Sequence, residues 1–173
     1  LREHGIAPRP DRILSVISIP GVAARKTYDV PVALMPGAGP TRDLPALSTR
    51  LLGQTQSIEV LYEDDLLLSE NIRPLPLMVA GTGFWGEIDF QAEEISYNPD
   101  IDHGQPNPVF TAASVEKGVP GDAGLSQGSS RLVVAGNAAV QDEVAAELSA
   151  TGRRFTLAPN VLPRIGVVAP TGL

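Results

Sequence analysis

Cysteine is absent from the 173 residues of this chain. Its absence excludes disulfide bonds, metal sites built on thiolates and a cysteine nucleophile. Basic side chains are few, 13 against 20 acidic ones, and the net charge is -7. This balance argues against a nucleic-acid partner, because phosphate binding needs a basic face. Long apolar runs are also absent: none approaches the about 18 residues that would cross a bilayer.

Glycine and proline are abundant instead, with 17 and 16 residues. So many helix breakers disfavour a helical bundle and predict short elements separated by turns. Hydrophobic residues make up 43% of the chain, which is enough for a core. The chain begins at Leu1 and has no pattern typical of a signal peptide. We therefore expect residues 1–173 to be a single domain excised from a larger protein.

Alternating or apolar patterns predict strands in four segments: residues 12–19, 56–61, 74–81 and 108–117. Pro31 lacks a ladder donor, so residues 28–34 are predicted to be an edge strand or a loop. Gly5 is predicted to cap a helical turn, since glycine reaches the left-handed conformation without a Cβ clash. Residues 119–130 are predicted to be an exposed hairpin or a linker.

The segment from residue 131 to residue 150 has the pattern of a βα unit. RLVVA (residues 131–135) predicts a buried parallel strand, and Gly136 and Asn137 supply a turn. In residues 138–150 an apolar residue recurs every four positions, which predicts an amphipathic helix. This order is typical of an open α/β sheet.

Candidate catalytic and metal-binding residues are scattered. His4 and His103 are distant in sequence, and a solvated loop is the better interpretation of each. The acidic residues around 63–65 and 93–94 have no spacing that forces two carboxylates across a cleft. Residues 98–104 begin like a calcium loop, but Val109 stands where a bidentate Glu is needed.

The glycine-rich turns predict no nucleotide site. The turn at Gly136 belongs to neither a G-x-G-x-x-G nor a Gly-Lys-Ser/Thr motif. GTGFWG (residues 81–86) carries Phe84 and Trp85 where a nucleotide loop needs small residues. We therefore predict Phe84 and Trp85 as contact residues, with the loops 35–45 and 119–130 as further contact surfaces. No catalytic, cofactor-binding or metal-binding residue is predicted.

Four segments resemble one family in the order of the chain. They are LREHGIAPRPDRIL (residues 1–14), MVAGTGFWGEIDF (78–90), PNPVFTAASVE (106–116) and SSRLVVAGNAAVQ (129–141). They resemble the GldG-type proteins, gliding-motility-associated auxiliary components of ABC transport systems. Two departures are Phe84, where the family has a small polar residue, and Asn137, where the family's turn has Asp.

The resemblance implies an α/β fold, either flavodoxin-like or glutamine-amidotransferase-like, with long loops. It implies a non-catalytic, extracytoplasmic (periplasmic) accessory domain of an inner-membrane protein, with an ABC permease and ATPase as partners and no cofactor. The membrane would be reached only through segments outside this chain. Amidotransferase chemistry is excluded, because it needs a cysteine.

Two alternatives remain open. A small-molecule or carbohydrate-binding module would have a cleft at the carboxyl ends of parallel strands. A hydrolase that uses carboxylates would have two acids facing each other at roughly 5 to 9.5 Å.

Overall fold

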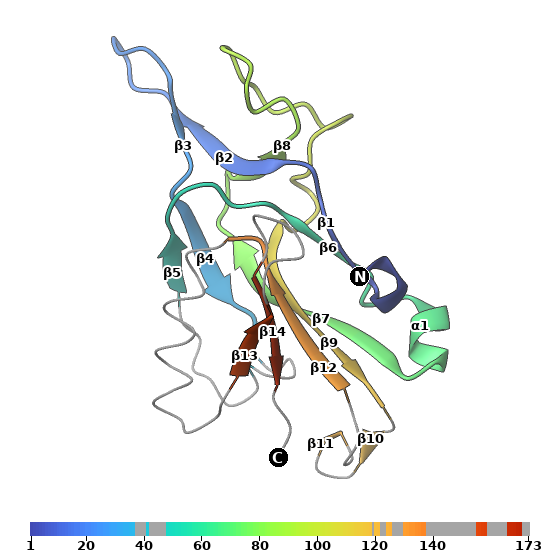
Figure 1. Ribbon diagram of the computed structural model, residues 1–173. Coiled ribbons are helices and arrows are strands. Elements are labelled where there is room, and N and C mark those ends of the chain that lie inside the picture. The colour runs from blue at the N-terminus through green and yellow to red at the C-terminus, as the bar shows by residue number, and fades with distance from the viewer. Residues whose placement is uncertain are drawn as a thin grey trace.

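The computed structural model describes residues 1–36, 41, 48–118, 120–121, 124–125, 130–137, 155–158 and 166–170. These residues are mostly β-structure, in antiparallel sheets that curl into a half-barrel (Figure 1). The main sheet follows the order β13 (Phe155–Ala158), β14 (Gly166–Pro170), β12 (Ser130–Ala135), β9 (Phe110–Lys117), β7 (Ile72–Ala80), β4 (Val30–Leu34) and β5 (Ser48–Leu51).

Two further strands join the start of β9. β6 (Ile58–Val60) pairs along its length with β1 (Ile6–Pro8) and meets β9 only at Phe110. A separate three-stranded sheet consists of β3 (Arg25–Thr27), β2 (Arg12–Ile17) and β8 (Trp85–Glu87). At the top of Figure 1 the β2–β3 hairpin and the loop after β8 extend away from the main sheet.

The remaining elements are short. The 3-10 helix η1 (Arg2–His4) opens the chain, and α1 (Asp65–Ser69) precedes β7. The Asp64 carboxylate caps α1 by accepting hydrogen bonds from the amides of Leu66 and Leu67. Strands β10 (Pro120–Gly121) and β11 (Gly124–Leu125) pair as a small antiparallel hairpin.

The predicted α/β fold is wrong. The apolar run after residue 130 does form a strand, but β12 pairs antiparallel with β9, from Ser130 opposite Lys117 to Ala135 opposite Ala112. On its other side β12 is antiparallel to β14. A buried apolar run is compatible with either direction of pairing, so the pattern could not reveal the hairpin connection to β9. The predicted helix at 138–150 lies outside the described residues.

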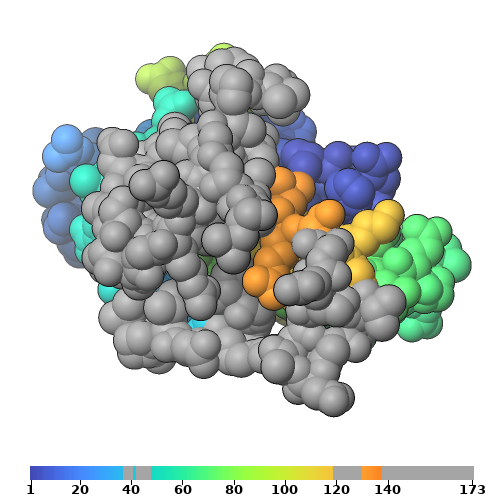
Figure 2. Space-filling view, turned by 60° about the horizontal axis from the view of Figure 1, so that its bottom comes forward, coloured from blue at the N-terminus to red at the C-terminus, as the bar shows by residue number. Residues whose placement is uncertain are grey.

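Figure 2 shows residues 130–137 in orange at the surface, beside the yellow end of β9 and the green residues around α1. An ion pair joins β9 and β12 where Arg131 lies directly opposite Glu116, with 3.3 Å between Arg131 Nε and Glu116 Oε1. Opposite charges in a directly facing cross-strand pair favour this register.

Several local predictions are confirmed. Gly5 ends η1 with a φ of 73°, in the left-handed conformation. Strands occupy the predicted segments around β2, β6, β7 and β9. Of the two alternatives for residues 119–130, the hairpin is present as β10 and β11.

The prediction for Pro31 is wrong, because β4 has neighbours on both sides, β5 and β7. Proline is tolerated there because the β4–β7 ladder ends at this point. The Gly81 amide donates to the Pro31 carbonyl at 2.7 Å, and the missing proline donor falls one residue beyond the last pair of the ladder, Val32 with Ala80.

Apolar side chains form two buried clusters. The first consists of Ile6, Ile58, Val60, Ile72, Phe110, Ala113, Val115 and Val134. The second consists of Ile13, Val30, Val32, Leu51, Leu77, Met78, Val109 and Ala112. Strand β9 contributes to both, and six consecutive residues of it are buried. Burial on both faces makes β9 the centre of the fold.

Candidate functional site

The β2–β3 hairpin ends in an exposed apolar turn, which we call the apolar tip (residues 17–24). Every residue of the tip is exposed, and Ile17, Ile19 and Val22 are each more than half exposed. The Val22 amide donates to the Ile19 carbonyl at 3.0 Å, and Gly21 has a φ of 81°, as in a type II turn with Pro20 at its first central position. A hairpin end at which three large apolar side chains are exposed close together is typical of an interaction site.

The hairpin is held at its base. The Lys26 ammonium of β3 donates a hydrogen bond to the Ala92 carbonyl in the loop after β8. This contact joins the two segments that extend from the top of the molecule in Figure 1. A fixed hairpin loses less conformational freedom on binding than a mobile one.

The two residues predicted for contact, Phe84 and Trp85, are both partly buried. Phe84 packs against the second core cluster. The Trp85 ring packs edge-on with Tyr97, with 5.9 Å between the centroids, and its indole Nε1 donates to Glu87 Oε2 at 3.0 Å. Both side chains therefore have structural partners inside the chain. Their contact role stays a prediction. The predicted contact loops 35–45 and 119–130 lie largely outside the described residues.

Two open grooves flank the segment from Gln105 to Pro108. One groove, about 320 Å³, lies between this segment and β6; we call it the β6 groove. Tyr62 and Tyr97 line it together with polar side chains, which include Arg9, Glu59, His103, Gln105 and Asn107. The other groove, about 390 Å³, has Phe84 in its wall. Both volumes are near the lower end for ligand sites.

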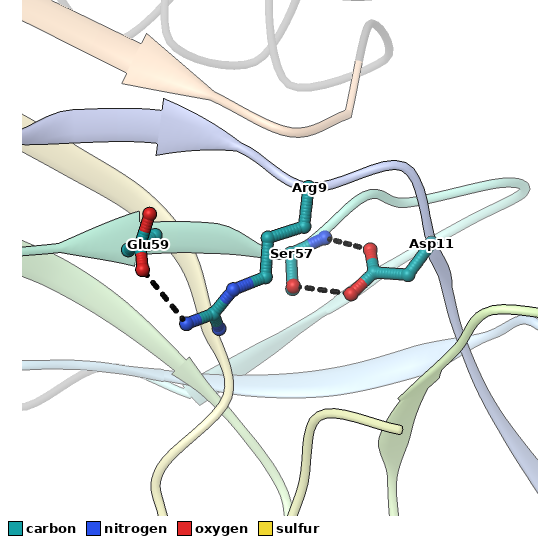
Figure 3. Close-up of polar contacts among 4 residues, drawn as sticks. All are labelled: Arg9, Asp11, Ser57 and Glu59. Atoms are coloured by element: carbon teal, nitrogen blue, oxygen red, sulfur yellow. Dashed lines mark hydrogen bonds and ion pairs between the residues drawn. The ribbon is translucent and has the colours of Figure 1, made fainter. Parts of the chain in front are cut away.

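Figure 3 shows two polar pairs near β6, Arg9 with Glu59 and Asp11 with Ser57. Arg9 Nη2 lies 3.7 Å from Glu59 Oε1 across the β1–β6 pair, so these two charges largely neutralise each other. Asp11 accepts two hydrogen bonds from Ser57: Oδ1 from the amide at 2.8 Å and Oδ2 from the hydroxyl at 2.5 Å. Asp11 and Ser57 are fully buried, so this pair is inaccessible to a substrate.

The other buried carboxylates also have structural roles. Glu87 accepts from the indole of Trp85 and from the Asp89 amide. Asp102 accepts from the amides of Ile88 and Asn98, and so closes the loop after β8. Because the chain's own donors occupy these carboxylates, none is placed for acid–base catalysis.

The described residues contain no group of three or more His, Asp or Glu side chains that could hold a metal ion. His4 lies beside Glu3 at the start of the chain, whereas His103 lines the β6 groove. The loop that begins like a calcium site is closed by its own side chains, since Asp102 and Asn98 bond to backbone amides within it. No helix in the described ranges is long and apolar enough to cross a membrane.

Sequence reasoning missed both the apolar tip and the β6 groove. The sequence does contain an indication of the apolar tip. Its Pro-Gly turn is flanked by Ile and Val, where hairpin turns usually carry polar residues. The sequence contains no indication of the β6 groove, because Tyr62 and Gln105 are brought together only by the fold. The cleft expected for a carbohydrate-binding α/β module has no counterpart, since the strand pairs of the described residues are all antiparallel.

Comparison with protein-family models, with curated proteins and with solved structures finds no match to this chain.

Proposed function

We propose that this chain is a non-catalytic contact domain, in an extracytoplasmic accessory protein of an ABC-type transport system. The observation that carries the contact function is the apolar tip, where Ile19 and Val22 are 57% and 56% exposed at the end of a braced hairpin. More than half of each of these Ile and Val side chains is exposed, and apolar surface of this kind is stabilised when a partner covers it.

The non-catalytic part of the proposal is supported by the buried carboxylates. Asp11, Glu87 and Asp102 are all bonded to donors of the chain itself. The transport setting is supported by the resemblance of four segments to GldG-type proteins. It does not draw support from the fold, because the α/β architecture implied by that resemblance is absent from the described residues.

The test is co-purification of the intact protein with the ABC permease and ATPase subunits that this proposal assigns to it as partners. Replacing two tip residues, Ile19→Ser with Val22→Ser, is expected to reduce recovery of the subunits about tenfold, as for loss of a central interface anchor. The control is Leu66→Ser, because Leu66 is 77% exposed but lies on α1. Both variants should unfold at the wild-type temperature.

The outcomes separate the two parts of the proposal. Unchanged recovery with the tip variant would overturn contact through the apolar tip. If the wild-type protein recovers neither subunit, the transport setting is wrong.

A further inference from the structure

The β6 groove exists because the ladder between β6 and β9 stops after one pair. Ile58 lies opposite Phe110, and the antiparallel register would next place Pro108 opposite Val60. Proline has no N–H group and cannot complete that pair. The two segments therefore separate, and Val60 and Pro108 both line the groove between them.

The unpaired side of β6 faces this groove. The Leu61 amide donates to the Gly5 carbonyl at 2.9 Å, and the Arg9 amide donates to the Ser57 carbonyl at 3.0 Å. Residues 57 and 61 therefore direct their main-chain groups toward β1. Because these directions alternate along a strand, the N–H and C=O of Val60 point to the opposite side, where β6 has no further ladder partner among the described strands. The groove thus contains a short stretch of free strand edge.

Aromatic rings stand at two places along the groove. Tyr62, 42% exposed, packs edge-on against Phe110 with 6.2 Å between the ring centroids. Tyr97 is fixed by its hydroxyl, which donates to the Gln105 carbonyl at 2.7 Å. Rings held in this way give side chains of an extended peptide an apolar surface at little conformational cost.

The lining of the groove carries one more acidic than basic side chain, with Glu59 and Asp102 against Arg9. Its one lysine or arginine, Arg9, is paired with Glu59. The sequence that follows Tyr62 is Glu63, Asp64 and Asp65, of which the first and last are exposed. A basic segment therefore complements this end of the groove, whereas an acidic one is repelled.

We propose that the β6 groove binds an extended basic segment of a partner protein. The segment adds main-chain hydrogen bonds at Val60 and lays its side chains against Tyr62 and Tyr97, in the manner of β-strand addition. This inference rests on the proposed contact function and defines the chemistry of the partner. It places a second contact at a distinct location from the apolar tip.

Titration of the purified chain with a synthetic peptide tests the proposal directly. The probe is acetyl-Lys-Val-Lys-Val-Lys-amide, and its matched control has Glu in place of each Lys. Trp85, the single Trp of the chain, packs against Tyr97 and reports binding by its fluorescence, with calorimetry as a second readout. The Lys peptide is expected to bind at least tenfold more tightly than the Glu peptide. N-methylation of the central Lys amide should weaken binding to a similar extent.

Variants of the chain locate the binding. Pro108→Val restores a donor opposite Val60, so the β6–β9 ladder can extend and close the groove. This variant is expected to lose peptide binding while unfolding at the wild-type temperature or above.

Single side chains of the groove are tested by matched pairs of variants. Tyr62→Ala should weaken peptide binding about tenfold, whereas Leu68→Ala, at the same 42% exposure on α1, should not. Glu63→Gln should weaken it about two- to fivefold, with Glu93→Gln as the control.

The proposal is overturned if both peptides bind equally, if neither binds, or if Pro108→Val folds and still binds. Binding of maltohexaose by the wild-type chain, without binding of the Lys peptide, would identify a carbohydrate site instead. If Pro108→Val does not fold, the comparison of Tyr62→Ala with Leu68→Ala decides the location. Failure of the peptide experiment leaves contact through the apolar tip intact, because that contact is measured by recovery of subunits.

Discussion

Asp11 and Ser57 are joined by two hydrogen bonds between one carboxylate and one residue, although 46 positions separate them in the sequence. Asp11 adjoins β2 and Ser57 adjoins β6, so the pair fastens the small sheet to the half-barrel (Figure 3). Both side chains are fully buried. A buried carboxylate is tolerated because its oxygens accept hydrogen bonds from fixed donors.

Asp11→Ala is expected to lower the free energy of unfolding by about 2 to 4 kcal/mol, since it leaves the amide and hydroxyl of Ser57 buried without an acceptor. Asp29→Ala, at an exposed position, is the control and should change stability by less than about 0.5 kcal/mol. Urea denaturation followed by circular dichroism measures both. Equal stabilities would show that the pair does not fasten the two sheets.

Gly86 should be coupled energetically to Asp11. A Cβ at Gly86 would lie 2.1 Å from Asp11 Oδ2, so Gly86→Ala is expected to cost about 3 kcal/mol or more. With Asp11→Ala the obstructing oxygen is absent, and the cost of Gly86→Ala should fall by at least about 1 kcal/mol in a double-mutant cycle.

Gly83→Ala is the control for the coupling between Gly86 and Asp11. Gly83 has a φ of 81° but no atom within 4 Å of an added Cβ, so its cost should be conformational, about 1 kcal/mol, and unchanged by Asp11→Ala. Additive costs for Gly86 would contradict the close approach.

The sequence was a good guide to local structure, because local structure depends on neighbouring residues. Gly5 could be predicted as a cap since only a left-handed residue ends the helix there, and Pro20–Gly21 could be predicted as a turn. The strand predicted at residues 131–135 is also present, as β12. These features need no knowledge of which segments pair.

The pairing of strands and the contacts of side chains between distant segments could not be predicted in this way. The antiparallel contact of β12 with β9 and the single β6–β9 pair are decided by packing between distant segments. Trp85 illustrates the same limit at the level of a side chain. Nothing in the sequence reveals that Glu87 and Tyr97 partly cover it and bind its indole nitrogen.

Trp85→Phe tests whether Trp85 is structural. The substitution keeps a ring against Tyr97 but removes the hydrogen bond to Glu87, a residue only 4% exposed. We expect a loss of about 1 to 2 kcal/mol in unfolding free energy and wild-type recovery of the transport subunits. The opposite result, unchanged stability with lost recovery, would make Trp85 a contact residue.

Removing either of two buried hydroxyls on β9 should not lower stability, in contrast to removing the Ser57 hydroxyl. Thr111 and Ser114 are each 1% exposed, and their hydroxyl oxygens have no hydrogen-bond partner within the described part of the chain. Thr111→Val and Ser114→Ala remove a buried polar group that gains nothing from folding, so we expect stability to stay equal or to rise by up to about 1 kcal/mol. Ser57→Ala, which removes a hydroxyl bonded to Asp11, should instead cost about 1 to 3 kcal/mol. A loss of more than about 1 kcal/mol in either β9 variant would mean that its hydroxyl has a partner in solution. Denaturation of the three variants side by side therefore separates hydroxyls that hold the fold together from hydroxyls that the fold merely tolerates.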